Sequence, residues 1–139
     1  SIRLPLVERP LECIPQPWVK FNLTGEPEKM GPVAEYAQKQ YGEEYFMQFS
    51  SPYFYEVMAK GANKGGMVRR LAQILEIRQE NVYCVGDHAN DIPMLTFART
   101  AFAPANAIQP VHEVPGIHIL PNCWENAIAA MIAELDKRY

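Results

Sequence analysis

Two aspartates four residues apart follow a short apolar run in the second half of the chain. The run 82–85 leads into Gly86 and Asp87, and Asn90 and Asp91 come directly after. Ligands of open α/β sheets bind beyond the carboxyl ends of the strands, so we expect Asp87 at such a site. Mg²⁺ usually takes one or two carboxylates and completes its shell with water and substrate phosphate. We therefore predict Asp87 and Asp91 as ligands of Mg²⁺.

Each aspartate also has an ordinary structural explanation. Asp91 stands where a helix is expected to begin and suits an N-cap, and Asp87 suits a turn after a strand. The set that also contains Gly86 and Asn90 is more specific than either aspartate alone. Histidine is suited to general acid–base work, but we favour a spectator or rim position for His88 over a general base.

Lys64 is the third candidate, followed by Gly65 and Gly66 at the expected start of a helix. The helix dipole disfavours a cation there, which suggests that another group favours it. An ammonium aimed at a phosphate, beside the N–H donors of the helix start, is one explanation. An exposed loop lysine is the other. The segment is not a P-loop, because it lacks the spaced glycines and a Ser or Thr after the lysine.

The elements that must position these side chains alternate between helices and short apolar strands. We expect helices over residues 64–75, 92–98 and 124–135, and strands over 81–85, 100–103 and 117–120. Strands separated by helices favour an α/β fold with a parallel sheet covered on both faces.

The first part of the chain has a different pattern. Four prolines in residues 1–17 predict an extended connector. Next come an expected strand over 18–23, a helix over 32–41 that Gly42 stops, and a hairpin of strands 45–50 and 53–58. These elements predict a small α+β unit with the order β-α-β-β. We divide the chain into a connector (1–17), this unit (18–59) and the α/β part (60–139).

Composition excludes several classes of protein. The net charge of −3 and pI of about 5.6 over 139 residues argue against nucleic acid or an anionic membrane as a partner. No apolar stretch reaches the roughly 20 residues that span a bilayer. Three widely spaced cysteines without a CxxC motif, and histidines without zinc-ligand spacing, favour a reduced, cytoplasmic protein without a zinc site.

The order of Lys64-Gly65, then Gly86-Asp87-x-x-Asn90-Asp91, then Ile92-Pro93-Met94-Leu95, resembles the haloacid-dehalogenase-like (HAD) hydrolases. The match is to the Cof-type branch, subfamily IIB, which inserts an α/β cap into a Rossmann-like core. The resemblance spans residues 18–135. It implies a Mg²⁺-dependent phosphatase that hydrolyses phosphomonoesters of small metabolites, such as sugar phosphates, through a phosphoaspartate.

The resemblance also implies a role for each candidate. Asp87 would bind Mg²⁺ directly and Asp91 would position the metal shell. Asn90 would contact the phosphoryl group or orient the lysine, and Lys64 would neutralise the charge of the phosphoaspartate. Residues 18–59 would form the second half of the cap, which selects the substrate, and residues 60–139 the C-terminal part of the core.

One departure from the family is the nucleophile. The aspartates of the chain are Asp87, Asp91 and Asp136, so no Asp-x-Asp motif is present. We expect the C-terminal portion of a longer phosphatase, inactive alone and binding Mg²⁺ weakly. The alternative is a noncatalytic binding or dimerising module derived from such an enzyme. An incomplete sheet also predicts self-association.

Overall fold

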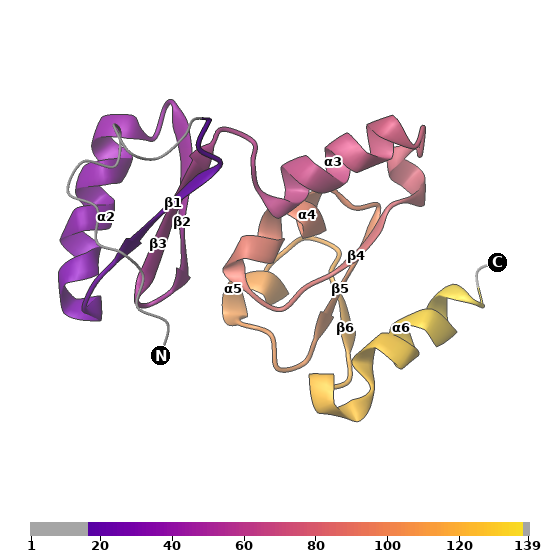
Figure 1. Ribbon diagram of the computed structural model, residues 1–139. Coiled ribbons are helices and arrows are strands. Elements are labelled where there is room, and N and C mark those ends of the chain that lie inside the picture. The colour runs from indigo at the N-terminus through magenta and orange to yellow at the C-terminus, as the bar shows by residue number, and fades with distance from the viewer. Residues whose placement is uncertain (1–16, 138–139) are drawn as a thin grey trace, which may run out of the picture.

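The computed structural model describes residues 17–137, which form two parts that follow each other along the chain (Figure 1). The expected connector over residues 1–17 lies almost entirely outside the described residues. No helix among residues 17–137 has the length and apolar character needed to cross a membrane.

The first part is an antiparallel sheet of three strands with one helix on it. The elements are β1 (Lys20–Thr24), α2 (Pro27–Tyr41), β2 (Tyr45–Ser51) and β3 (Phe54–Ala59), and the strand order is β1-β3-β2. Helix α2 packs through Met30, Ala34 and Ala37 onto Tyr55 and Met47 of the sheet. The predicted β-α-β-β order is confirmed.

Helix α2 differs from the prediction at its start. It begins at Pro27, five residues before the expected start, and Pro32 lies inside it. Proline is well tolerated at the first helical position, where its missing N–H has no partner in any case. The buried Met30 and Ala34 on either side of Pro32 show that packing on the sheet continues through it. Gly42 does end the helix, but with a right-handed φ of −63°.

The second part alternates strands and helices around a parallel sheet with the order β4-β5-β6. This confirms the predicted α/β class. Its elements are α3 (Lys64–Ile74), the 3₁₀ turn η1 (Gln79–Asn81), β4 (Tyr83–Val85), η2 (Ala89–Asp91), α4 (Ile92–Phe97), β5 (Thr100–Pro104), α5 (Gln109–His112), β6 (His118–Leu120), η3 (Cys123–Glu125) and α6 (Ala127–Leu135).

The central strand β5 is buried along its whole length and has a packed layer on each side. Ala101 and Ala103 belong to a cluster with Leu95 and Val111 from α4 and α5. Phe102 belongs to a second cluster, with Leu120 and Ala127 of β6 and α6. Alternate residues of a strand point to opposite faces, so helices cover both faces of this sheet, as the sequence predicts.

The two parts meet near the candidate residues. Helix α2 lies on the side of the first sheet that faces away from the second part (Figure 1). On the other side, strand β2 lies against the turn η2, which contains Asn90 and Asp91. Only residues 60–63 separate β3 from α3.

Candidate functional site

Asp87 lies just beyond the carboxyl end of β4, in a loop anchored at both sides. The N–H of Gly86 donates to the carbonyl of Phe102 at 3.1 Å, which extends the pairing of β4 with β5. The N–H of Ile108 donates to the carbonyl of Asp87 at 3.0 Å. The backbone at Asp87 is therefore tied to the next strand and to the loop after it, while the residue itself is exposed.

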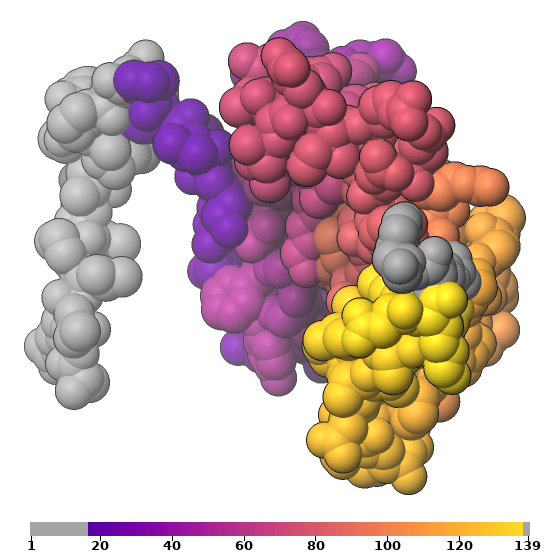
Figure 2. Space-filling model, turned by 90° about the vertical axis from the view of Figure 1, so that its right-hand side faces the viewer, coloured from indigo at the N-terminus to yellow at the C-terminus, as the bar shows by residue number. Residues whose placement is uncertain are grey.

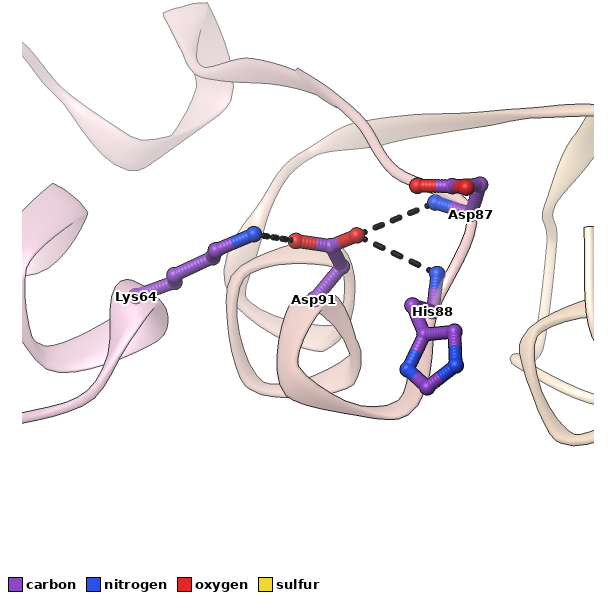
Figure 3. Close-up of polar contacts among 4 residues, drawn as sticks. All are labelled: Lys64, Asp87, His88 and Asp91. Carbon is purple, nitrogen blue, oxygen red and sulfur yellow. Dashed lines mark hydrogen bonds and ion pairs between the residues drawn. The ribbon is translucent and has the colours of Figure 1, made fainter. Parts of the chain in front are cut away.

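Asp91 is the buried carboxylate of the site, with a side chain 4% exposed. Its Oδ2 accepts the N–H of Asp87 at 3.0 Å and that of His88 at 3.2 Å. Its Oδ1 forms an ion pair with the ammonium of Lys64 (Figure 3). One carboxylate therefore holds the Asp87 loop on one side and the lysine on the other.

Two glycines allow these close approaches. A methyl group at Gly86 would lie 2.4 Å from the Cβ of Asp91, far inside van der Waals contact. A methyl group at Gly65 would lie 2.4 Å from the backbone carbonyl of Pro93, where α3 packs against the start of α4. Gly86 and Gly65 belong to the sequence motifs, but neither contact can be predicted from the sequence, because each depends on the packing of two elements.

The start of α3 positions the lysine. The side chain of Asn63 accepts the N–H of Gly66 at 2.8 Å and so acts as the N-cap of the helix. Lys64 follows as the first helical residue, and its side chain, 49% exposed, reaches the carboxylate of Asp91. The sequence suggests that another group must favour a cation at this helix start. In the structure that group is the carboxylate of Asp91.

The charge state of Asp91 follows from these contacts. Burial raises the pKa of Asp91, but the ammonium of Lys64 and the N–H groups of Asp87 and His88 more than offset this, so its pKa lies below the ordinary range. Asp91 is thus ionised at neutral pH. Its contribution to stability is lost only as the pH falls below the pKa of a free aspartate, about 3.9.

The structure brings Lys64 and Asp91 into contact and places Asp87 beside them through its main chain. Asn90 lies half-buried in η2 between the two aspartates. Within residues 17–137 the carboxylate of Asp87 makes no hydrogen bond or ion pair, and no group of three or more His, Cys, Asp or Glu side chains could hold a metal. A hard cation such as Mg²⁺ fits the exposed Asp87 carboxylate, with water and phosphate as further ligands.

A cavity of about 290 Å³ borders Asp87. Its wall includes Gly86, Pro104 and Cys123. The side chain of Asn106 accepts the N–H of Cys123 at 2.8 Å and joins the loop after β5 to the turn before α6. This role of Asn106 is not visible in the sequence, because its partner Cys123 lies 17 residues away.

Comparison with known proteins shows what the sequence is similar to. A family model described as haloacid dehalogenase-like hydrolase matches residues 7–132. The chain is 36% identical over 135 residues to the Bacillus subtilis (strain 168) protein named "Putative phosphatase YxeH", covering 96% of this chain and 50% of that one. It is 28% identical over 80 residues to the phosphoglycolate phosphatase of Thermoplasma acidophilum, covering 58% of this chain and 36% of that one.

The fold matches solved structures as well. The crystal structure of a haloacid dehalogenase-like hydrolase from Bacteroides thetaiotaomicron superposes with a TM-score of 0.74 at 27% identity, over 90% of this chain and 47% of that chain. The chain thus spans about half the length of the relatives it matches, or less, and the matched part is their C-terminal half. With most of its residues inside the family model, the chain belongs to the haloacid dehalogenase-like hydrolases.

Proposed function

We propose that this chain provides the lysine and aspartate half of a Mg²⁺-dependent phosphatase site in the cytoplasm, which hydrolyses phosphomonoesters of small metabolites. The observation that supports this most is the Lys64–Asp91 ion pair, held beside the exposed Asp87 at the carboxyl end of β4. The family of hydrolases to which the chain belongs supports the same chemistry.

Each residue has a role in this proposal. Asp87 binds Mg²⁺ directly, while Asp91 orients the Asp87 loop and Lys64 around the metal. Lys64 neutralises part of the charge that builds up on the phosphoryl oxygens during transfer, and a Mg²⁺ held by Asp87 would supply further positive charge there. Asn90, next to Asp91, contacts the phosphoryl group or orients the lysine.

The nucleophile of the proposed reaction is not in this sequence. A phosphoaspartate requires an aspartate in line with the leaving oxygen. Asp87 and Asp91 already have other roles, and Asp136 follows the end of α6. We therefore propose that the chain alone binds phosphate and Mg²⁺ weakly and does not turn over substrate.

We also propose that the chain self-associates through its second part. Strand β4 is an edge strand of the sheet among the described residues. Helices α3 and α6 lie on the side turned away from the first part (Figure 2) and bear large apolar side chains at least half exposed. These are Met67, Leu71 and Ile74 on α3, and Ile128 and Ile132 on α6. A surface of this kind favours association with another apolar surface.

The test is to titrate the chain with inorganic phosphate in the presence of Mg²⁺, following backbone amides by NMR, and to assay p-nitrophenyl phosphate hydrolysis. We expect shifts at Lys64 and around Asp87, no turnover, and at least tenfold weaker phosphate binding in Lys64→Met, because one ion pair to phosphate is lost. Asp87→Asn should remove the effect of Mg²⁺ on the binding.

Lys60→Met is the matched control. Lys60 is a lysine of the same connection between β3 and α3. Its ammonium, however, donates to the backbone carbonyl of Glu43 in the first part, at 2.6 Å. Phosphate binding should therefore be unchanged. Equal binding by wild type and Lys64→Met would contradict the proposed site, and Mg²⁺-dependent hydrolysis by this chain would contradict the missing nucleophile.

A further inference from the structure

The backbone of Asp87 is held by hydrogen bonds on both sides of its Cα. Its N–H donates to the Oδ2 of Asp91 at 3.0 Å, and its carbonyl accepts the N–H of Ile108 at 3.0 Å. Because peptide groups are planar, fixing both of them leaves the Cα–Cβ bond between them little freedom. The direction in which the Asp87 carboxylate leaves the backbone therefore depends on Ile108 as well as on Asp91.

Ile108 ends a short loop, residues 105–108, which connects β5 to α5. The loop is fixed at its start, where the N–H of Ala105 donates to the carbonyl of Leu120 at 3.0 Å. It is fixed at its end, where the carbonyl of Ile108 accepts the N–H of Val111 at 2.9 Å. The position of the Ile108 N–H, and with it that of Asp87, thus depends on how the loop is held between these two points.

Asn106 lies in the exposed middle of this loop and connects it to the turn η3. Its Oδ1 accepts the N–H of Cys123, the first residue of η3, at 2.8 Å. The cavity of about 290 Å³ is bordered by Asp87, by Cys123 and by Pro104, which precedes the loop. This space leaves room for the loop to shift, and the hydrogen bond from Cys123 to Asn106 opposes such a shift.

We propose that Asn106 is a positioning residue for Asp87. Its bond to Cys123 holds the loop 105–108, and the loop holds the N–H of Ile108 at the carbonyl of Asp87. The Asp87 carboxylate is thereby kept in the orientation in which it binds Mg²⁺. The inference rests on the proposed function, because it takes Asp87 to be the ligand.

A carboxylate ligand of Mg²⁺ needs such support. Mg²⁺ demands a near-ideal octahedral geometry, so the direction of each ligand matters. Among residues 17–137 the contacts of Asp87 are made by its main chain, and no side-chain hydrogen bond orients its carboxylate (Figure 3). Partners that bond directly to a metal ligand change metal affinity by roughly 10- to 100-fold. Asn106 acts one step further away, through the backbone, so its effect should be smaller.

The experiment is a Mg²⁺ titration of the full chain at a fixed concentration of inorganic phosphate, following the amide of Asp87 by NMR. Asn106→Ala should bind Mg²⁺ about threefold more weakly than wild type, within the range that one hydrogen bond provides. Gln109→Ala is the matched control. Gln109 is also exposed, but its side chain donates to Glu113 of the same segment at 3.3 Å, so its loss should leave Mg²⁺ binding unchanged.

Amide hydrogen exchange without Mg²⁺ gives a second readout. In Asn106→Ala the N–H of Ile108 should exchange about threefold faster, because its bond to the carbonyl of Asp87 opens more often. The N–H of Gly86, which donates to the carbonyl of Phe102, should exchange at the wild-type rate. An Asn106 with a merely structural role would lower the unfolding temperature without changing Mg²⁺ binding.

Cys123→Pro breaks the same bond from the donor side. Asn122 has φ −58° and ψ 155°, the extended conformation that a residue before proline adopts, and proline suits the first position of a helical turn. Cys123→Pro should weaken Mg²⁺ binding as much as Asn106→Ala, whereas Cys123→Ala, which keeps the N–H, should bind as wild type. The double variant should bind no more weakly than either single variant, because both remove one bond.

The outcomes separate the two proposals. Unchanged Mg²⁺ affinity in Asn106→Ala, or losses in Asn106→Ala and Cys123→Pro that add in the double variant, would overturn this inference and leave the proposed function intact. Faster exchange at Ile108 without weaker Mg²⁺ binding would overturn it as well. Binding of Mg²⁺ by Asp87→Asn as tight as by wild type would overturn both proposals.

Discussion

At the scale of single residues, Asp91 makes the contacts that hold the proposed site together. The sequence left open whether it caps backbone N–H groups or takes part in a metal site. In the structure it accepts two N–H groups and pairs with Lys64, which leaves Asp87 as the more available carboxylate.

Gly86→Ala should destabilise the chain by about 1–3 kcal/mol, as overpacking does in a closely packed site. The added methyl group would lie 2.4 Å from the Cβ of Asp91, so the Asp87 loop must move and the contact of Asp91 with Lys64 is disturbed. Urea unfolding followed by circular dichroism measures this change in the free energy of unfolding.

Gly31→Ala is the control, because a methyl group there meets no atom within 4 Å and the residue lies inside α2. Alanine at such a position should stabilise the chain by about 0.4–1 kcal/mol. Equal effects of the two substitutions would show that the close approach of Gly86 to Asp91 does not constrain the loop.

The sequence was sufficient to select Lys64, Asp87, Asn90 and Asp91, because their types and spacing are visible along the chain. It was not sufficient to predict which oxygen of Asp91 meets which partner, since Lys64 lies 27 residues away. Nor could it predict contacts between strands of the first sheet, such as Gln48 beside Glu56, because these depend on the register.

At the scale of elements, β5 organises the second part, because its alternate residues contribute to two separate clusters. Leu95 of α4 is 1% exposed and packs on the side of Ala101 and Ala103. Leu95→Ala should therefore lower the free energy of unfolding by about 2–5 kcal/mol. Urea unfolding of the variant measures the loss.

Leu71→Ala is the matched control for this substitution. Leu71 also lies on a helix of the second part but is 55% exposed, so its truncation should cost less than about 1 kcal/mol at a dilution that keeps the chain monomeric. A loss at Leu71 as large as that at Leu95 would mean that the exposed face of α3 is buried in solution, as self-association would produce.

Most elements could be predicted because their apolar periodicity is local. The exceptions have tertiary causes. The start of α2 lies before Pro32 because packing of Met30 on the sheet continues the helix through the proline. The last expected helix is interrupted at Asn126, which adopts a left-handed φ of 60° between η3 and α6. Trp124 therefore lies outside α6, and it is 71% exposed.

At the scale of the whole molecule, the second part has an edge strand on one side and exposed apolar helices, which support the proposed self-association. Sedimentation at several micromolar concentrations should show species larger than a monomer. Ile128→Asp on α6 should shift the population toward monomer, because a charge replaces a half-exposed apolar side chain. A compact monomer at all concentrations would contradict the proposal.

The short connection between the two parts has a consequence for chimeric proteins. Residues 60–63 join β3 directly to Lys64, so the position of the lysine relative to the first sheet depends on this short connection. Replacing the first sheet by that of a relative preserves the ion pair with Asp91 only if this connection keeps its length. An insertion there would displace Lys64 relative to the first sheet, so such a graft succeeds only if residues 60–63 keep their length.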